Sequence, residues 1–323
     1  MTRALLLAFT LLAGLFAKQG GARVAGRIDL STFIPEGLAV DADTGAIYVG
    51  SIRHGGIARL DGRNGWRWFV PPRAHGSWGF LGLKADPARR RLWAVSNARP
   101  NLLGFREADR GRSAVFVFDL RSGALVRRVD LPDRGVHLLN DLALTPDGGA
   151  WVSDSEAGAL WRVPPRGRPT RLPLARRLEY PNGLVLTRDG RGLLVVEDAG
   201  SGLCRVDFDG SVRPVPAWPG ASFTGLDGLT RHGAGLLAVQ NGRDPGRILS
   251  LRLDGDERTV SAVKVLLEGH PLLAEVPTTG DLLGTEFVFI ANSLIHRLGD
   301  DGRLRPGPDS PPVILAVEVG PVP

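Results

Sequence analysis

Hydrophobic and polar positions recur along the chain as two apolar segments joined by a short polar turn. Clear examples are residues 140–155, NDLALTPDGGAWVSDS, and residues 182–199, NGLVLTRDGRGLLVVEDA. Short runs rich in Leu, Val and Trp that are joined by Asp-Gly turns predict antiparallel β-hairpins. The same pattern starts at six places along the sequence: Glu36, Leu81, Asn140, Asn182, Asp227 and Thr278.

The spacing of these units predicts the fold. Successive units start roughly 40 to 60 residues apart, and a third apolar strand follows in most of them, as in residues 114–120 and 247–253. Six such units predict an all-β, six-bladed β-propeller over residues 23–323. A strand near Val24 or the C-terminal strand at 313–319 would pair with the last blade and close the ring. The repeat is too long for a β-helix and too regular for two unrelated β-sandwiches.

The N-terminus has the features of a targeting segment. Arg3 precedes an apolar run over residues 4–17, which a polar stretch follows. The run is short for a membrane span, which needs about 20 residues. We therefore expect a signal peptide at residues 1–22, an exported protein that is periplasmic or secreted, and no stable membrane span after cleavage. An uncleaved anchor is the alternative.

Composition excludes several classes of protein. The chain has 323 residues, a formal net charge of +6 and a single cysteine, Cys204, so it has no intrachain disulfide framework and no multi-cysteine metal site. Its arginines are scattered along the chain and form no basic stripe, so we expect no nucleic-acid partner. We expect a monomer that acts on a small molecule.

The phase of the repeat predicts a polar ring. The first strand of each propeller blade runs along the central channel, so residues at one phase gather around the axis. Four of the six first strands start with a side-chain oxygen: Glu36, Asn140, Asn182 and Asp227. All six second strands end on a polar residue: Ser51, Asn97, Asp154, Asp198, Asn241 and Asn292.

Two carboxylates and two amides form a set of hard oxygen ligands. Such a set at a central channel mouth predicts a metal-binding site for one divalent cation, most favourably Ca²⁺, with Mg²⁺, Mn²⁺ or Zn²⁺ as alternatives. The competing interpretation is that each Asn or Asp caps a turn through its own backbone.

Four short motifs at these positions carry a family resemblance. They are Pro-Glu-Gly at 35–37, Asn-Asp at 140–141, Pro-Asn-Gly at 181–183, and Asp-Gly at 227–228 followed by Asn-Gly-Arg at 241–243. Over about residues 30–300 the chain resembles the senescence-marker-protein/gluconolactonase family, which includes regucalcin-like lactonases. The resemblance implies one axial cation, usually calcium, with Glu36, Asn182 and Asp227 as direct ligands. It makes Asn140 a ligand or a holder of water and substrate, and it implies lactone hydrolysis.

One departure from the family concerns the substrate. Gluconolactonase-like members carry an arginine two residues before the Asn-Asp pair, whereas this chain has Leu138. We therefore expect a less polar substrate than an aldonolactone. Residues 97–112 lengthen the second blade on the face of the site and could act as a lid. The candidate substrate-binding residues are Asn97, Arg99, Asn140 and Asn241, and within the lid also Asn101 and Arg106.

The predicted chemistry is metal-assisted hydrolysis of a lactone or related ester. Asp227 is the first candidate for the general base or nucleophile, since it can face both the cation and the substrate. Asp154, His137 and His75 are the second candidates.

Two other functions are also compatible with the sequence. One is a non-catalytic propeller that binds a protein or a sugar in the cell envelope, for which an exposed cluster of Trp66, Trp68, Trp78 and Phe80 would be the marker. The other is a metal-free propeller that resembles strictosidine synthase. A serine hydrolase has no support, because the chain has no G-x-S-x-G motif.

Overall fold

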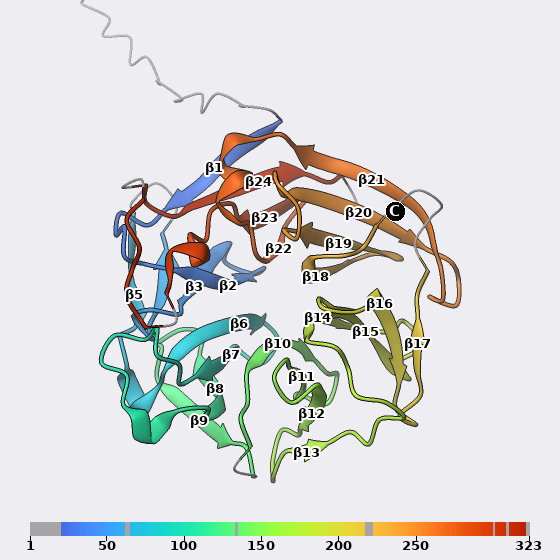
Figure 1. Ribbon diagram of the computed structural model, residues 1–323, viewed down its shortest axis with the longest axis horizontal. Helices are drawn as coiled ribbons and strands as arrows, with labels where there is room; N and C mark the ends of the chain where they lie inside the picture. Colours follow the sequence, from blue (N-terminus) through green and yellow to red (C-terminus); the bar gives the residue numbers. More distant parts are fainter. Residues whose placement is uncertain are drawn as a thin grey trace, which may run out of the picture.

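Six four-stranded antiparallel sheets are arranged around a central axis (Figure 1). This computed structural model describes residues 21–61, 65–132, 135–216, 222–299, 301–307 and 310–320. The predicted all-β, six-bladed propeller is confirmed. The signal peptide predicted over 1–22 lies outside the described residues except for Gly21 and Ala22. In the described ranges, no helix is long and apolar enough to cross a membrane.

Each of the first three blades is built from four consecutive strands. Blade 1 contains β2 (Pro35–Asp41), β3 (Ala46–Ser51), β4 (Ile57–Leu60) and β5 (Trp66–Val70). Blade 2 contains β6 (Gly79–Asp86), β7 (Arg91–Asn97), β8 (Ser113–Asp119) and β9 (Leu125–Asp130). Blade 3 contains β10 (Leu139–Leu144), β11 (Ala150–Asp154), β12 (Ala159–Val163) and β13 (Thr170–Arg171).

Blades 4 and 5 follow the same plan, and blade 6 takes one strand from the N-terminus. Blade 4 contains β14 (Pro181–Leu186), β15 (Gly192–Glu197), β16 (Gly202–Asp207) and β17 (Val212–Pro214). Blade 5 contains β18 (Leu226–His232), β19 (Gly235–Gln240), β20 (Arg247–Leu253) and β21 (Val260–Glu268). Blade 6 contains β22 (Gly280–Leu283), β23 (Glu286–Ile290), β24 (Val313–Glu318) and β1 (Ala22–Arg27). Short 3-10 helices interrupt the loops: η2 (Ala74–Gly76), η3 (Glu107–Asp109), η4 (Pro271–Glu275) and η5 (Ile295–Arg297).

The ring is closed by pairing between the two ends of the chain. β1 pairs antiparallel with β24, with Ala22 opposite Val317 and Arg27 opposite Val313. Both strands that the sequence offered for closure therefore belong to the last blade. This pairing protects the edge of β24 and ties the first described residues to the last blade.

A β-bulge interrupts the innermost hairpin in five of the blades. In blade 1, Pro35 pairs with Ser51 and Leu38 pairs with Val49, so two residues of β2 oppose one residue of β3. The register breaks at the corresponding place in β6, β10, β14 and β18. The bulged pairs are residues 36–37, 81–82, 140–141, 182–183 and 227–228. A bulge re-aims a side chain out of the ladder, and here it does so at the repeat phase that the sequence singled out.

Apolar side chains pack between neighbouring blades. Tyr48 of blade 1 and Phe80, Phe116 and Phe118 of blade 2 are buried in one cluster. The rings of Phe116 and Phe118 are stacked with their centroids 5.9 Å apart. Burial of these large side chains on both faces of each sheet is the main force that holds the blades together.

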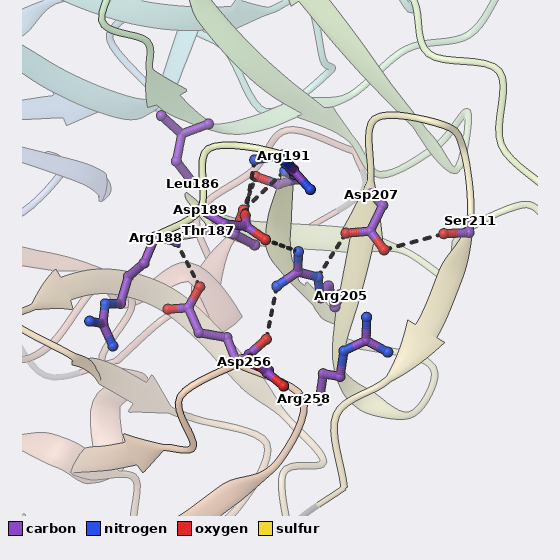
Figure 2. A network of polar contacts seen from close by, with 12 residues as sticks. Leu186, Thr187, Arg188, Asp189, Arg191, Arg205, Asp207, Ser211, Asp256 and Arg258 are labelled. Carbon is purple, nitrogen blue, oxygen red and sulfur yellow. Dashed lines mark hydrogen bonds and ion pairs between the residues drawn. The ribbon is translucent and has the colours of Figure 1, made fainter.

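Arg205 joins blades 4 and 5 through a polar network (Figure 2). Its guanidinium is buried and donates to Asp189 Oδ2 at 2.6 Å, to Asp207 Oδ1 at 2.7 Å and to the carbonyl oxygen of Asp256 at 2.9 Å. Asp189 and Asp256 lie in turns of different blades, so one side chain fixes the relative position of two sheets.

Candidate active site

The four predicted axial residues all lie at bulges of innermost strands. Glu36 is on β2, Asn140 on β10, Asn182 on β14 and Asp227 on β18. The strands approach one another closely at this level: a Cβ added at Gly183 would lie 2.4 Å from the carbonyl oxygen of Asp227. Glycine at the second bulge position of blades 1, 2, 4 and 5 therefore lets neighbouring innermost strands approach one another closely.

The partly buried Glu36 and the buried Asp227 form a pair of interacting acids. Burial raises the pKa of Glu36 well above its ordinary value, and the nearby charges of Asp227 and Asp141 raise it further. Burial, together with the charge of Asp198, raises the pKa of Asp227 to about 8. The Oε2 atom of Glu36 is buried and has no hydrogen-bond partner among the described residues. Buried carboxylates of this kind call for a proton or a cation.

Two amides hold the carboxylate of Asp227. Asn241 donates from Nδ2 to Asp227 Oδ2 at 2.6 Å, and it also donates to the carbonyl oxygen of Pro277, at the entrance to blade 6, at 2.9 Å. Asn182 hydrogen-bonds to the same carboxylate, and both amides lower the pKa of Asp227 against the effect of burial. Asn241 thus supports an axial residue from behind, and it is not on the wall of the cavity described below.

Asn140 is anchored through its amide nitrogen. Its Nδ2 atom donates to Ser155 Oγ at 3.0 Å, and Ser155 Oγ donates to the carbonyl oxygen of Pro181 at 2.7 Å. This chain of bonds links blade 3 to the first residue of β14. It leaves Oδ1 of Asn140 available as an oxygen ligand.

Asp141 is a buried acid that the sequence analysis did not single out. It occupies the bulge position that is glycine in blades 1, 2, 4 and 5. Its Oδ1 accepts from the Leu142 N–H at 2.8 Å, whereas Oδ2 is buried and has no hydrogen-bond partner in the part of the chain described. Burial raises the pKa of Asp141, against the opposing charge of Lys84. In the sequence, Asp141 could have been recognised because it replaces the glycine found at the same position of four other units.

A cavity of about 500 Å³ opens beside the axial residues. Its wall contains six of the predicted site residues and several apolar side chains, whereas Asp227 lies behind the wall and is not one of its lining residues. The lining residues are Glu36, Ile52, Leu81, Asn97, Arg99, Pro100, Asn101, Arg110, Leu138, Asn140, Glu156, Tyr180, Asn182, Ile295, Leu298 and Gly299. The axial carboxylate Glu36 and the amides of Asn140 and Asn182 therefore face a space large enough for a small-molecule ligand.

Two long loops border this cavity and contact each other. Residues 98–112, between β7 and β8, contribute Pro100 and Asn101, and the segment between β23 and β24 contributes Ile295 and Leu298. Arg53, in the loop between β3 and β4, donates from Nη1 to the carbonyl oxygen of Gly302 at 2.9 Å and so holds the second of these loops. A Cβ at Gly302 would lie 2.1 Å from the carbonyl oxygen of Pro100, so the two loops touch. The loop between β23 and β24 contains no recognisable motif. In the sequence, only its length indicated that it could contribute to a site.

The predicted substrate-binding residues Asn97 and Arg99 both lie on the cavity wall. Asn97 is held by the next blade: it donates to the carbonyl oxygen of Leu139 at 2.8 Å and accepts from the N–H of the same residue at 2.8 Å. It therefore fixes the entry of β10 next to Asn140. Arg99 donates to Glu156 Oε1 at 2.9 Å across the cavity rim.

His137 and Asp154 form a buried hydrogen-bonded pair behind the wall. Nδ1 of His137 lies 2.6 Å from Asp154 Oδ2, which also accepts from Trp161 Nε1 at 3.0 Å. Asp154 Oδ1 accepts from the N–H of Leu138 at 3.0 Å. Burial alone would raise the pKa of Asp154, but the bonds from His137, Leu138 and Trp161 outweigh it and lower that pKa. This pair fixes the backbone of Leu138, whose side chain lines the cavity.

The remaining candidates lie away from the cavity. His75 is in η2 with its ring 6.3 Å from that of Phe118, and Arg106 is bonded to Asp109 at 2.8 Å. In the aromatic group, Trp78 and Phe80 are buried, and Trp66 and Trp68 pack around Phe33. These aromatic side chains therefore contribute to packing within the fold and form no exposed cluster.

The donor set at the axis fits a hard divalent cation. Within the described ranges, no three Asp, Glu, His or Cys side chains are grouped as a metal site. Any site at the axis therefore draws on amide oxygens as well as on Glu36 and Asp227. The orphaned Glu36 Oε2 and the mutual repulsion of the two acids are both relieved by a positive charge between them. Carboxylate and amide oxygens are the ligands that calcium prefers.

The fold and the cavity define a six-bladed propeller with a polar axial site, and solved structures share this architecture. An aldose sugar dehydrogenase from Streptomyces coelicolor, in its PQQ-bound form, aligns with a TM-score of 0.62 at 17% identity, covering 91% of this chain and 96% of that one. A gluconolactonase from Xanthomonas campestris aligns with a TM-score of 0.61 at 16% identity, covering 95% and 92%. A luciferin-regenerating enzyme aligns with a TM-score of 0.59 at 15% identity, covering 93% and 96%.

These similarities confirm the resemblance of the fold to gluconolactonase-like propellers. No protein-family model matches the chain, and no curated protein matches its sequence. The neighbours carry the names of different enzymes, so the fold alone does not select a reaction. The reaction depends on the axial residues and the cavity.

Proposed function

We propose that this protein is a metal-dependent hydrolase that opens a lactone or a related ester. The observation that carries the proposal is the buried, unpartnered Oε2 of Glu36 beside Asp227, at the axial end of a cavity of about 500 Å³. Glu36, Asn140, Asn182 and Asp227 would hold the cation, with calcium as the first choice. When bound, a divalent cation supplies polarisation of the carbonyl oxygen and a lowered pKa for water.

The chain's own residues then bind the substrate and move a proton. Hydrolysis adds the oxygen of water to the carbonyl carbon and breaks the bond between that carbon and the ring oxygen. Asp227 accepts one proton from the water and returns it to the ring oxygen, which leaves as a hydroxyl group. The other proton of the water leaves when the product carboxyl ionises.

The supporting side chains have separate parts in this scheme. Asn182 and Asn241 orient the Asp227 carboxylate, and Ser155 orients Asn140. Arg99 and Asn97 lie on the substrate side of the cavity. His137 and Asp154 act as positioning residues for the wall at Leu138. The proposal includes an exported monomer that is periplasmic or secreted and whose partner is its small-molecule substrate.

The test is lactone hydrolysis by protein stripped with chelator and reloaded with Ca²⁺, Mg²⁺, Mn²⁺ or Zn²⁺. Proton release from a panel of lactones and aryl esters reports the activity. We expect activity only with added metal, and a loss of at least about 100-fold in Glu36→Gln, because metal-site carboxylates act directly on affinity and chemistry. Glu268→Gln is the matched control, since Glu268 is an exposed acid at the end of β21 and does not line the cavity. Equal activity in chelator and in calcium would overturn the proposal.

A further inference from the structure

One side of the cavity wall is apolar and continuous with the protein core. Ile52 and Leu81 line it and belong to the buried cluster between blades 2 and 3. Leu138, Ile295 and Leu298 also line it and pack against the same cluster. Apolar side chains from four separate segments therefore meet on one side of the cavity, next to the axial residues.

The polar side chains on the wall are mostly engaged with protein partners. Arg99 is bonded to Glu156 at 2.9 Å, and Asn97 Oδ1 accepts from Ser113 Oγ at 2.6 Å and from the N–H of Leu139. A ligand with many hydroxyl groups needs a partner for each one that it buries, because an unpaired buried hydroxyl loses binding free energy. The apolar wall offers no such partners.

Apart from the axial Glu36, Asn101 is an exception on the wall. Its Oδ1 atom is buried and has no hydrogen-bond partner among the described residues. An acceptor in this state is satisfied by a single O–H or N–H donor on a ligand. Away from the axial residues, the cavity therefore suits one donor group and an adjacent apolar group.

We infer that the substrate is a lactone or cyclic ester that carries an aliphatic substituent in place of the hydroxyl groups of a sugar lactone. The inference rests on the proposed function for the reacting end of the site. The carbonyl group lies at Glu36, Asn140 and Asn182, and the aliphatic group lies against Leu138, Ile295 and Leu298. A donor on the substituent bonds to Asn101 Oδ1.

A homologous series of substrates tests this assignment. We would measure kcat/KM for γ-butyrolactone, γ-hexalactone, γ-octalactone and γ-decalactone, with glucono-δ-lactone as the polar comparison, on calcium-loaded protein. Each added methylene that becomes buried should raise kcat/KM by about fourfold until the chain outgrows the cavity. The longer alkyl lactones should exceed glucono-δ-lactone.

Two variants test whether the apolar side of the cavity wall causes the preference for alkyl lactones. Leu138→Asn should remove most of the dependence on chain length, and Leu298→Asn should reduce it. Leu103→Asn is the matched control, because Leu103 is an exposed leucine on the same face that does not line the cavity. If Leu138→Asn lowers the melting temperature strongly, Leu298→Asn carries the test alone.

Direct binding separates this inference from the proposed function. Calorimetric titration of γ-decalactone and of glucono-δ-lactone into wild type and Leu138→Asn needs no turnover. Hydrolysis of glucono-δ-lactone with no gain from alkyl chains would support the function and overturn the inference. Absence of all hydrolysis would overturn the function, while tighter binding of the alkyl lactone that Leu138→Asn abolishes would still support the inference. Binding of the alkyl lactone that is weaker than that of glucono-δ-lactone, or no binding of either lactone, would overturn the inference.

Discussion

Asn241 donates a 2.6 Å hydrogen bond to Asp227 across the innermost hairpin of blade 5. The donor is the first residue after β19 and the acceptor is at the bulge of β18. The bond lowers the pKa of Asp227, whereas burial raises it. Asn241 therefore makes the axial carboxylate easier to ionise, against the larger effect of burial.

Replacing Asn241 should weaken the metal site without removing a ligand. We expect Asn241→Leu to lower calcium affinity by about 10-fold, as loss of an outer partner of a ligand does. Calcium titration by calorimetry measures this. Asn292→Leu is the control at the equivalent position of blade 6, where Asn292 bonds to the backbone at Pro311 and Val313 and, among the described residues, to no axial carboxylate. An equal loss of affinity in both variants would show a general effect on folding.

The buried acids predict an unusual dependence of stability on pH in metal-free protein. Because folding raises the pKa of Asp227 to about 8, the folded state binds its proton more tightly than the unfolded chain does. The free energy of unfolding should therefore fall as the pH rises from about 4, the ordinary value of an aspartate, towards 8. Glu36, whose pKa is also raised, acts in the same direction.

Asp227→Asn removes one of these acids and should reveal the effect. In chelator, its melting temperature should exceed that of wild type at pH 7.5, and the difference should shrink towards pH 5. Differential scanning calorimetry at several pH values measures both. A variant less stable than wild type at pH 7.5 in chelator would contradict the electrostatic account of the axial pair.

The His137–Asp154 pair predicts the opposite behaviour with pH. Folding lowers the pKa of Asp154, so its contribution to stability is present above about pH 4 and is lost as the pH falls through its lower value in the folded state. Asp154→Asn turns an amide N–H₂ towards hydrogen-bond donors and should destabilise the fold by about 2 to 3 kcal/mol in urea unfolding. The kcat/KM of the folded variant should change by less than about fivefold. A 100-fold loss at unchanged stability would instead assign the pair the catalytic role that the sequence suggested.

Arg205 should contribute to stability far from the site. Arg205→Leu leaves Asp189, Asp207 and the carbonyl group of Asp256 without their shared donor (Figure 2), at a cost of about 3 kcal/mol. Arg213→Leu is the control, since Arg213 is an exposed partner of the same Asp207 and its loss should cost about 0.5 kcal/mol. Urea unfolding compares the two. Equal effects would show that the network does not join the blades.

The repeat explains why so much of the architecture could be predicted. A propeller repeats one hairpin pattern. The position of Glu36 within the first unit therefore predicts that Asn182 and Asp227 occupy the same position in later units. Strand bulges then keep these residues facing the axis. The sequence therefore predicted the six blades, their closure and the residues that gather at the axis.

The polar residues at the ends of the second strands show what the repeat does not predict. Asn97, Asp154 and Asn241 share a phase, yet their partners differ. Asn97 bonds to the backbone of Leu139, Asp154 bonds to His137 and to the N–H of Leu138, and Asn241 bonds to Asp227. Phase predicts the height of a residue along the axis, whereas its partner depends on which strand enters beside it. Ile295 and Leu298 were missed for a related reason: loops between strands have no period, so their place on the cavity wall follows from tertiary contacts alone.

The central claim is that Glu36, Asn140, Asn182 and Asp227 hold one divalent cation. The most direct test is the melting temperature of chelator-stripped protein with Ca²⁺, Mg²⁺ or Zn²⁺ added back, beside Asp227→Ala. At 100 times its dissociation constant a bound ion stabilises by about 2.7 kcal/mol. For a chain of this length that corresponds to a rise of several degrees, at about 2 °C or more per kcal/mol. We predict a rise that is largest with calcium and absent in Asp227→Ala. No rise with any ion in protein shown to be metal-free, or an equal rise in the variant, would contradict the axial metal site.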